Sequence, residues 1–215
     1  MSEQLEIPQS EFLSIIASFF PDSEIKNIME IGSLNGNDAR LYKSRYPNAN
    51  VYCIEGLKDN FDLYIKDSTD LIPINMIVTD FDGTISFHKK NINGIHSIYN
   101  RGDVYGTDIL INQPCKTFDT ICNEYGIPNI DVIKIDVEGA TFEVLSGMKE
   151  RIKDIKIMHI ETESVPFFQG QKLHDDVANY LITNGFELVK MTRVNISGGF
   201  QHDSVWINKK AYGKD

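Results

Sequence analysis

Short apolar runs alternate with helix-like segments along this chain, and this alternation restricts the possible folds more than any other feature. Apolar runs at 27–31, 51–54 and 74–79 are separated by helix-like segments at 38–46 and 57–66. Such β-α-β-α-β alternation builds a parallel sheet with right-handed crossovers. We therefore predict an α/β fold. The later predicted elements are strands at 109–111, 132–135, 155–160, 186–189 and 204–207, and helices at 117–125, 141–148 and 173–184.

Two of the predicted strands end in glycine-containing turns that lie far apart in the sequence. The first turn is 30–38 (EIGSLNGND), and the second is 133–140 (IKIDVEGA). In each, a buried strand gives way to polar residues and glycine and then to a helix. Ligands of open α/β sheets bind at the carboxyl ends of the strands. The two turns therefore predict a site for a nucleotide-like cofactor with acidic groups beside it.

The residue types in the first turn indicate which cofactor it could hold. Gly32 and Gly36 permit tight backbone geometry, and the following helix offers free N–H groups. Glu55 closes the second strand, where an acid accepts hydrogen bonds from ribose hydroxyls. The third glycine of a dinucleotide fingerprint is absent, and Asn35 and Asp38 suit a tail that carries an ammonium and a sulfonium. S-adenosylmethionine has both groups, whereas the alternative is an ordinary turn plus a surface glutamate.

Length and charge exclude several classes of protein. The 215 residues fit one domain, 1–215, with an N-terminal helix inside 1–22. The net charge of −10 disfavours nucleic acid as the main partner. Cysteines number three and lack metal-like spacing, no apolar run reaches the ~20 residues of a membrane span, and no basic region precedes the first apolar stretch. We expect a cytoplasmic protein; its oligomeric state is not indicated.

One segment interrupts the alternation. Within the predicted loop of 88–113, residues 91–108 are rich in Asn, Gly, Ser and Tyr and show little periodicity. A loop of this length inside a compact domain is usually functional. We predict a lid or substrate-facing loop in which Tyr99, Arg101 and Tyr105 bind a polar substrate, although they could instead pack the loop onto the domain.

Acidic residues follow two neighbouring predicted strands. Asp136 and Glu138 end one, and Glu161 and Glu163 end the other. Crowded carboxylates raise one another's pKa, which suits a general base, or else bind a divalent metal. We predict Asp136 and Glu161 as catalytic residues and regard a metal as possible but not favoured. Asp136 could instead pair with Lys134.

Histidines offer a third candidate for the general base. His96 lies in the irregular segment and could close over a substrate. His159 alternates with Glu161 along one strand and fits a hydrogen-bonded core position better, and His202 begins the final strand. We predict His96 as the third catalytic residue.

A competing motif occupies residues 77–84 (IVTDFDGT). It resembles the first motif of haloacid-dehalogenase-like phosphatases, in which Asp80 would attack phosphorus and Asp82 would handle the leaving-group proton. The later motifs of that family are missing, because the next strand ends in Asn112 and Gln113 where Ser or Thr is needed. A hairpin turn at Asp82 and Gly83 is the simpler interpretation.

The segment 133–147, with KIDVEGATFEVLSG at its centre, resembles the hallmark of FkbM-type methyltransferases, a branch of the class I S-adenosylmethionine-dependent enzymes. Residues 30–36 resemble that family's D-x-G-x-N-x-G turn with glutamate in place of aspartate, and 117–121 and 80–87 resemble two further elements. The resemblance implies a Rossmann-like, doubly wound seven-stranded sheet, mostly parallel with an antiparallel C-terminal strand. It also implies methyl transfer, commonly to a hydroxyl oxygen, on substrates from polyketides to sugars.

Carried over by position, the first turn would hold the methionine part, Glu55 the ribose, and Thr79 and Asp80 would lie near the adenine, while Asp136 would face the reacting centre. We thus predict O-methylation of a small molecule or glycan. A binding module that has lost its chemistry and the phosphatase are the alternatives. The predicted cofactor-binding residues are Glu30, Gly32, Ser33, Asn35, Gly36, Asp38, Glu55, Gly56, Thr79 and Asp80.

Overall fold

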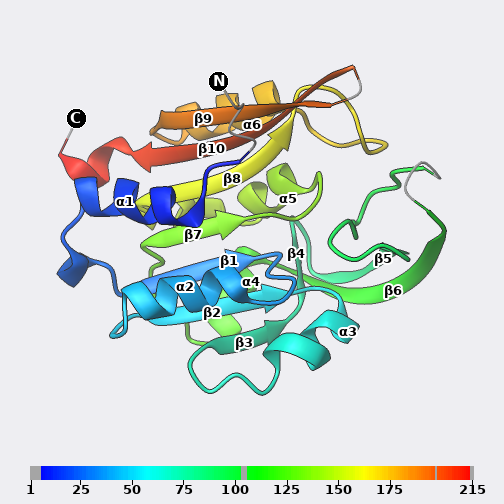
Figure 1. Cartoon of the computed structure of the whole chain (residues 1–215), viewed down its shortest axis with the longest axis horizontal. Coiled ribbons are helices and arrows are strands. Elements are labelled where there is room, and N and C mark those ends of the chain that lie inside the picture. The colour runs from blue at the N-terminus through cyan, green and yellow to red at the C-terminus, as the bar shows by residue number, and fades with distance from the viewer. Residues whose placement is uncertain (1–5, 103–105, 197, 214–215) are drawn as a thin grey trace.

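The computed structural model describes residues 6–102, 106–196 and 198–213. Its centre is a seven-stranded sheet in the order β3-β2-β1-β7-β8-β10-β9 (Figure 1). Only β10 runs antiparallel to its neighbours, β8 and β9. The predicted Rossmann-like α/β sheet is confirmed, and its closing hairpin places β9 at the edge. The strands are β1 (Asn27–Ile31), β2 (Asn50–Glu55), β3 (Ile72–Asn75), β7 (Val132–Ile135), β8 (Ile157–Glu163), β9 (Phe186–Ile196) and β10 (Gly199–Asn208).

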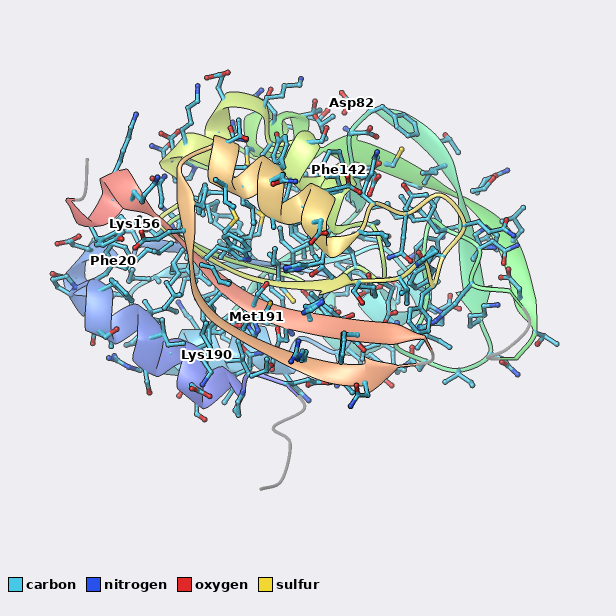
Figure 2. All side chains as sticks on the ribbon, turned by 90° about the horizontal axis from the view of Figure 1, so that it is seen from above. Phe20, Asp82, Phe142, Lys156, Lys190 and Met191 are labelled. Atoms are coloured by element: carbon cyan, nitrogen blue, oxygen red, sulfur yellow. The ribbon has the colours of Figure 1, made fainter. Side chains whose placement is uncertain are left out.

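Helices cover both faces of this sheet because its central strands are apolar on both sides. Along β1, Ile28 packs toward α1 (Gln9–Phe19) and α2 (Asn37–Arg45), whereas Met29 packs toward the opposite face. Figure 2 shows α1 on one side of the sheet and α6 on the other. The second face carries α4 (Phe118–Glu124), α5 (Thr141–Ser146) and α6 (His174–Thr183).

Shorter helical turns connect these elements. The helix predicted at 57–66 is α3 (Lys58–Asn60) continued by a π-helical turn, Phe61–Ile65. The 3₁₀ turns are Asp22–Glu24, Lys149–Asp154 and Lys209–Tyr212.

A second sheet of three strands projects from the first. It contains β4 (Ile77–Thr79), β5 (Gly83–Lys90) and β6 (Asp108–Thr117) in the order β4-β6-β5. The strand predicted at 74–79 is therefore wrong as one unit, because the chain leaves the main sheet at Met76. The strand predicted at 109–111 belongs to this sheet and not to the main one.

The bounds of the loop predicted over 88–113 also need correction. β5 continues to Lys90 and β6 begins at Asp108, so the irregular segment is 91–107, of which 103–105 lie outside the described residues. Long-range pairing of β5 with β6 supplies the backbone hydrogen bonds. Ile109 and Leu110 are both exposed on the β5–β6 ribbon. The sequence therefore lacks the alternation of apolar and polar residues that would reveal the full length of these strands.

The carboxyl ends of β1, β2, β7 and β8 meet at one edge of the main sheet, since these strands are parallel neighbours. This edge faces the second sheet and the 91–102 segment (Figure 1). Within the described residues, every helix is too short or too polar to cross a lipid bilayer.

Candidate active site

A cavity of about 590 Å³, including its open mouth, lies at the carboxyl ends of β1, β2 and β7. This is the edge where the sequence predicts a cofactor, and ligands of open α/β sheets bind at such strand ends. Five of the predicted site residues line it: Gly32, Glu55, Gly56, His96 and Asp136. Its other walls are largely apolar and include Leu34, Met76, Ile77, Val78, Phe87, Ile98 and Val137.

The turn after β1 fits closely against the turn after β7. Gly32 adopts a φ of +84°, and a Cβ atom there would lie 1.7 Å from the backbone oxygen of Asp136. The N–H groups of Gly32 and Ser33 both donate to the Ile54 oxygen at 3.0 Å, which ties the turn to β2. Gly36, with a φ of +71°, then starts α2. Glycine is required at position 32 by both conformation and space.

Glu55 sits at the end of β2 as predicted and is largely buried. Its Oε2 accepts the Leu34 N–H at 2.8 Å, and its Oε1 accepts the Leu57 N–H at 2.7 Å. Burial raises the pKa of Glu55 to about 7, although both hydrogen bonds act in the opposite direction. A carboxylate has roughly four lone-pair sites, so each oxygen can still accept a bond from a ligand hydroxyl.

Several residues predicted to bind the cofactor lie behind the cavity wall instead. Glu30 is buried, and its Oε2 accepts the Ala39 N–H at 3.1 Å. Burial raises the pKa of Glu30 to about 8. Asp38 binds Lys134 Nζ at 2.6 Å. Ser33 Oγ donates to the Glu30 backbone oxygen, and Asn35 Oδ1 accepts the Asn37 N–H. These side chains hold the turn in place, and direct cofactor contact by them stays a prediction.

Thr79 and Asp80 follow the part of β4 that faces the cavity. Thr79 is fully buried and donates from Oγ1 to Asp80 Oδ1 at 3.2 Å. The residues of β4 that line the cavity are Ile77 and Val78. The apolar side chains before Thr79 are thus better placed for an adenine ring than Thr79 itself.

The sequence left two roles open for Asp136, as a residue of the active site or as an ion-pair partner of Lys134, and the structure is compatible with both. Asp136 lines the cavity, and its Oδ2 also lies 3.3 Å from Lys134 Nζ. Burial alone would lower the pKa of Lys134. The three neighbouring carboxylates, those of Asp136, Glu30 and Asp38, have the larger combined effect, so the pKa is raised. Asp136 is therefore both a cavity residue and part of a buried ion-pair network.

Three carboxylates gather at the tips of β7 and β8. Asp136, Glu138 and Glu161 each offer an oxygen, and these atoms lie within 4.8 Å of one another. Burial and the nearby Asp136 raise the pKa of Glu138 to about 8, and burial and the same neighbours raise that of Glu161. Such a group can share a proton at neutral pH or hold a divalent cation.

His96 lines the cavity from the 91–102 segment, but both its ring nitrogens have protein partners. Nδ1 accepts the Lys90 N–H at 3.1 Å, and Nε2 lies 3.1 Å from Asn93 Oδ1. Burial lowers the pKa of His96. A neutral ring with both nitrogens engaged is a poorer general base than the sequence suggested.

The rest of this segment is packed onto the domain. Tyr99 Oη donates to Glu143 Oε1 at 2.7 Å, and Arg101 binds Glu138 Oε2 at 3.0 Å. The Arg101 guanidinium also lies 4.9 Å from the centre of the Phe168 ring. Tyr105 is outside the described residues.

Sequence reasoning missed some cavity residues. Asn60, Phe87 and Ile98 line the cavity, and a lone residue in a helix, strand or loop carries no signal for such a place. Leu34 could have been found from its position between Gly32 and Gly36. In the structure, its backbone N–H donates to Glu55.

The phosphatase alternative is wrong. Asp82 Oδ1 accepts the Thr117 N–H at 2.8 Å, and its Oδ2 accepts from Thr120 Oγ1 at 2.8 Å, so Asp82 joins the β5 turn to the start of α4. Figure 2 shows it on the side of the sheet away from α1. Neither Asp80 nor Asp82 lines the cavity.

The fold is a Rossmann-like α/β fold with a cavity at the carboxyl ends of its parallel strands. Comparison with known proteins gives the family. The model of the FkbM methyltransferase domain matches residues 30–188. The chain therefore belongs to the FkbM methyltransferase family, as its motifs predict, and this membership excludes a haloacid-dehalogenase-like phosphatase.

Two curated relatives are similar at 26% identity. One is the 2-O-methyltransferase NoeI of Sinorhizobium fredii, matched over 67% of this chain and 66% of its own length. The other is the hexuronic acid methyltransferase AglP of Haloferax volcanii, matched over 68% of this chain and 60% of its own. The chain thus spans somewhat less than two thirds of each relative.

Among solved structures, the magnesium protoporphyrin IX methyltransferase (ChlM) of Synechocystis PCC 6803 with bound SAH is similar in fold. The TM-score is 0.50 at 9% identity, over 93% of this chain and 81% of that one.

Proposed function

We propose that this protein transfers a methyl group from S-adenosylmethionine to a hydroxyl oxygen of a sugar or a related small molecule. Support comes from membership of the FkbM family and from two relatives whose names describe a 2-O-methyltransferase and a hexuronic acid methyltransferase. The observation that carries the proposal is a single cavity that runs from Glu55 and Gly56 to Asp136.

The cavity residues suit this cofactor. Glu55 would accept bonds from the ribose hydroxyls while its two backbone bonds hold it still. Ile77, Val78 and Phe87 offer apolar contact to an adenine, and the close-packed turn at Gly32 would receive the amino-acid tail. When bound, S-adenosylmethionine supplies an activated sulfonium methyl group. Alignment of the two reactants by these walls could contribute roughly 7–11 kcal/mol of barrier reduction.

Asp136 would take the proton from the acceptor hydroxyl. It is the one residue of the three predicted catalytic residues that lines the cavity and also belongs to the carboxylate cluster. Glu161 would tune that cluster and His96 would shape the wall. A general base contributes typically 10²–10⁴-fold. We propose that a shared proton, and not a resident metal, relieves the crowding, so that turnover persists in a chelator.

Calorimetric titration with S-adenosylmethionine, followed by assay of S-adenosylhomocysteine with glycoside acceptors, tests the proposal. We expect a Kd on the order of micromolar, about −8 kcal/mol, and acceptor-dependent turnover. Binding without turnover on any hydroxylated acceptor would favour the non-catalytic module. Absence of binding would overturn the cofactor assignment.

Three broader expectations belong to the same proposal. One domain over 1–215 is supported by the continuous main sheet. A cytoplasmic location is supported by three cysteines that are all unpaired. The net charge of −10 supports a small-molecule or glycan acceptor over nucleic acid.

A further inference from the structure

A second hollow adjoins the cofactor cavity on the α1 face of the sheet. It spans about 350 Å³, including its open mouth, between the segment that leads into α1, the end of β7, and β8 and β10. Asp136 lines both spaces. A group bound in the second hollow would therefore lie next to Asp136, on the side away from Glu55.

The second hollow is strongly acidic. Glu6, Asp136, Glu161 and Asp203 line it, and Lys134 is the only cation among its described lining residues. Lys134 is already engaged, with its Nζ 2.6 Å from Asp38, 3.3 Å from Asp136 and 3.9 Å from Glu30. An incoming anion would meet several carboxylates and no cation that is not already neutralised.

The second hollow is also lined by a residue that carries an unsatisfied polar atom. His159 lines it, is 2% exposed, and places its Nε2 2.5 Å from Asp203 Oδ1. Asp203 Oδ2 accepts the Ile7 N–H at 2.5 Å, which fixes the carboxylate. The other ring nitrogen, Nδ1, is buried and has no hydrogen-bond partner among the described residues. Leaving such a group without a partner is costly, so a ligand hydroxyl that reached it would be stabilised.

We propose that the second hollow receives an uncharged, hydroxyl-rich part of the methyl acceptor and discriminates against acceptors that carry a carboxylate there. The proposal rests on the methyltransferase function above. Glu6 and Asp203 accept hydrogen bonds from sugar hydroxyls, and Glu161 does so even while its cluster shares a proton. A uronate would instead bring a like charge to these acids and to the crowded group of Asp136, Glu138 and Glu161, where repulsion is strong because the site is partly desolvated. On this basis the chain would differ in specificity from its hexuronic acid relative.

The test compares matched acceptors. Methyl glucoside, galactoside and mannoside are assayed beside the corresponding methyl uronides, by S-adenosylhomocysteine release and by titration into protein saturated with S-adenosylhomocysteine. We expect each accepted neutral glycoside to exceed its uronide at least tenfold in kcat/KM, and by a similar ratio in affinity. Uronides that react equally well or better would overturn the proposal, as would binding of none of the six sugars by protein that binds S-adenosylmethionine normally.

Charge-neutral variants localise the effect. Glu161→Gln and Glu6→Gln should each narrow the ratio of neutral to uronide affinity about threefold or more. Asp175→Asn, which removes the same charge from an exposed position at the start of α6, should leave the ratio unchanged. Because the ratio is also read from binding, loss of turnover in Glu161→Gln does not obscure it. Unchanged ratios in both Glu variants would refute the role of the second hollow. Failure of the unmodified protein to bind S-adenosylmethionine would instead count against the proposed function.

Discussion

The two ends of the candidate active site are held together in different ways. At the β1–β2 end, backbone groups and one carboxylate do the work, since Gly32 packs against the Asp136 backbone and Glu55 accepts two N–H groups. At the β7–β8 end, side-chain charges dominate, with Lys134 shared by several acids and three carboxylates crowded together. The first end is a cradle held mainly by backbone geometry around the single carboxylate of Glu55, whereas the second crowds several carboxylates whose total charge depends on protonation.

Replacing Asp136 tests the charged end and should have the largest effect. We expect Asp136→Asn to lower kcat about 10²–10⁴-fold while S-adenosylmethionine affinity changes little, because the amide keeps the shape but is not a base. Turnover and calorimetric binding are the measurements. Asp38→Asn is the matched control, since Asp38 also binds Lys134 but does not line the cavity. Equal losses in both variants would mean that Asp136 acts through the ion-pair network.

The cradle is tested by Gly32→Ala. A Cβ atom 1.7 Å from the Asp136 oxygen must displace the turn, so we expect S-adenosylmethionine affinity to fall by about 100-fold, or ~3 kcal/mol, with lower stability in urea. Gly126→Ala is the control, because Gly126 has a φ of +62° but no atom within 4 Å of the added Cβ. It should show only the backbone strain, about 1–2 kcal/mol in stability, and normal binding. Similar affinity in the two variants would contradict the cradle.

Glu55→Gln examines the contact between cradle and ribose. Glutamine has one acceptor oxygen, so its NH₂ group would face the N–H of Leu34 or Leu57 and compete with the ribose for the remaining oxygen. We expect S-adenosylmethionine to bind about 10–30-fold more weakly by calorimetry. Glu150→Gln, at an exposed position that pairs with Lys153, should bind as the unmodified protein does. If Glu55→Gln also binds normally, ribose recognition lies elsewhere.

The pH dependence of stability tests whether the buried carboxyl groups titrate as expected, and its predicted effect is the smallest. Burial raises the pKa of Glu30 and Glu138 from 4.5 to about 8 and raises that of Glu161. A raised carboxyl pKa favours the folded state at low pH, and this contribution is lost as pH rises through the folded-state value. The melting temperature should therefore fall by about 2–4 °C per kcal/mol of stability lost as the pH rises from about 4.5 to about 8, the interval between the unfolded-state and folded-state pKa values. Glu161→Gln should flatten this slope and Glu150→Gln should not; parallel slopes would show that the cluster does not titrate there.

The sequence predicts the cradle better than the charged end, for a physical reason. The sequence reveals the residues of the cradle, Gly32, Gly36 and Glu55, because a positive φ and the end of a strand are local properties of the chain. The association of Lys134 with Asp38, and of His159 with Asp203, depends on strand register and on a helix packed far away in the sequence. The catalytic role of His96 stays a prediction, and the sequence does not reveal that Lys90 and Asn93 contact its ring nitrogens.

The same distinction applies to the fold. Strands buried on both faces, such as β1 and β7, are mostly apolar, and the seven-stranded sheet follows from them and from the family motifs. The β5–β6 ribbon is half exposed and is held by long-range pairing. The loop predicted over 88–113 is too long for that reason, although its aperiodic part, 91–108, closely matches the interval between β5 and β6.

The place of β10 has a consequence for how this molecule is made. β10 lies between β8 and β9, and its Asp203 holds both His159 and the backbone N–H of Ile7. During synthesis the ribosome releases residues 6–163 well before residue 203, so the sheet waits with an open edge at β8, and the segment before α1 has no anchor. The nascent chain can complete its second hollow only after Asp203 has emerged from the ribosome. A ribosome stalled before residue 199 would therefore hold a chain with the cofactor cradle but without the complete acidic hollow.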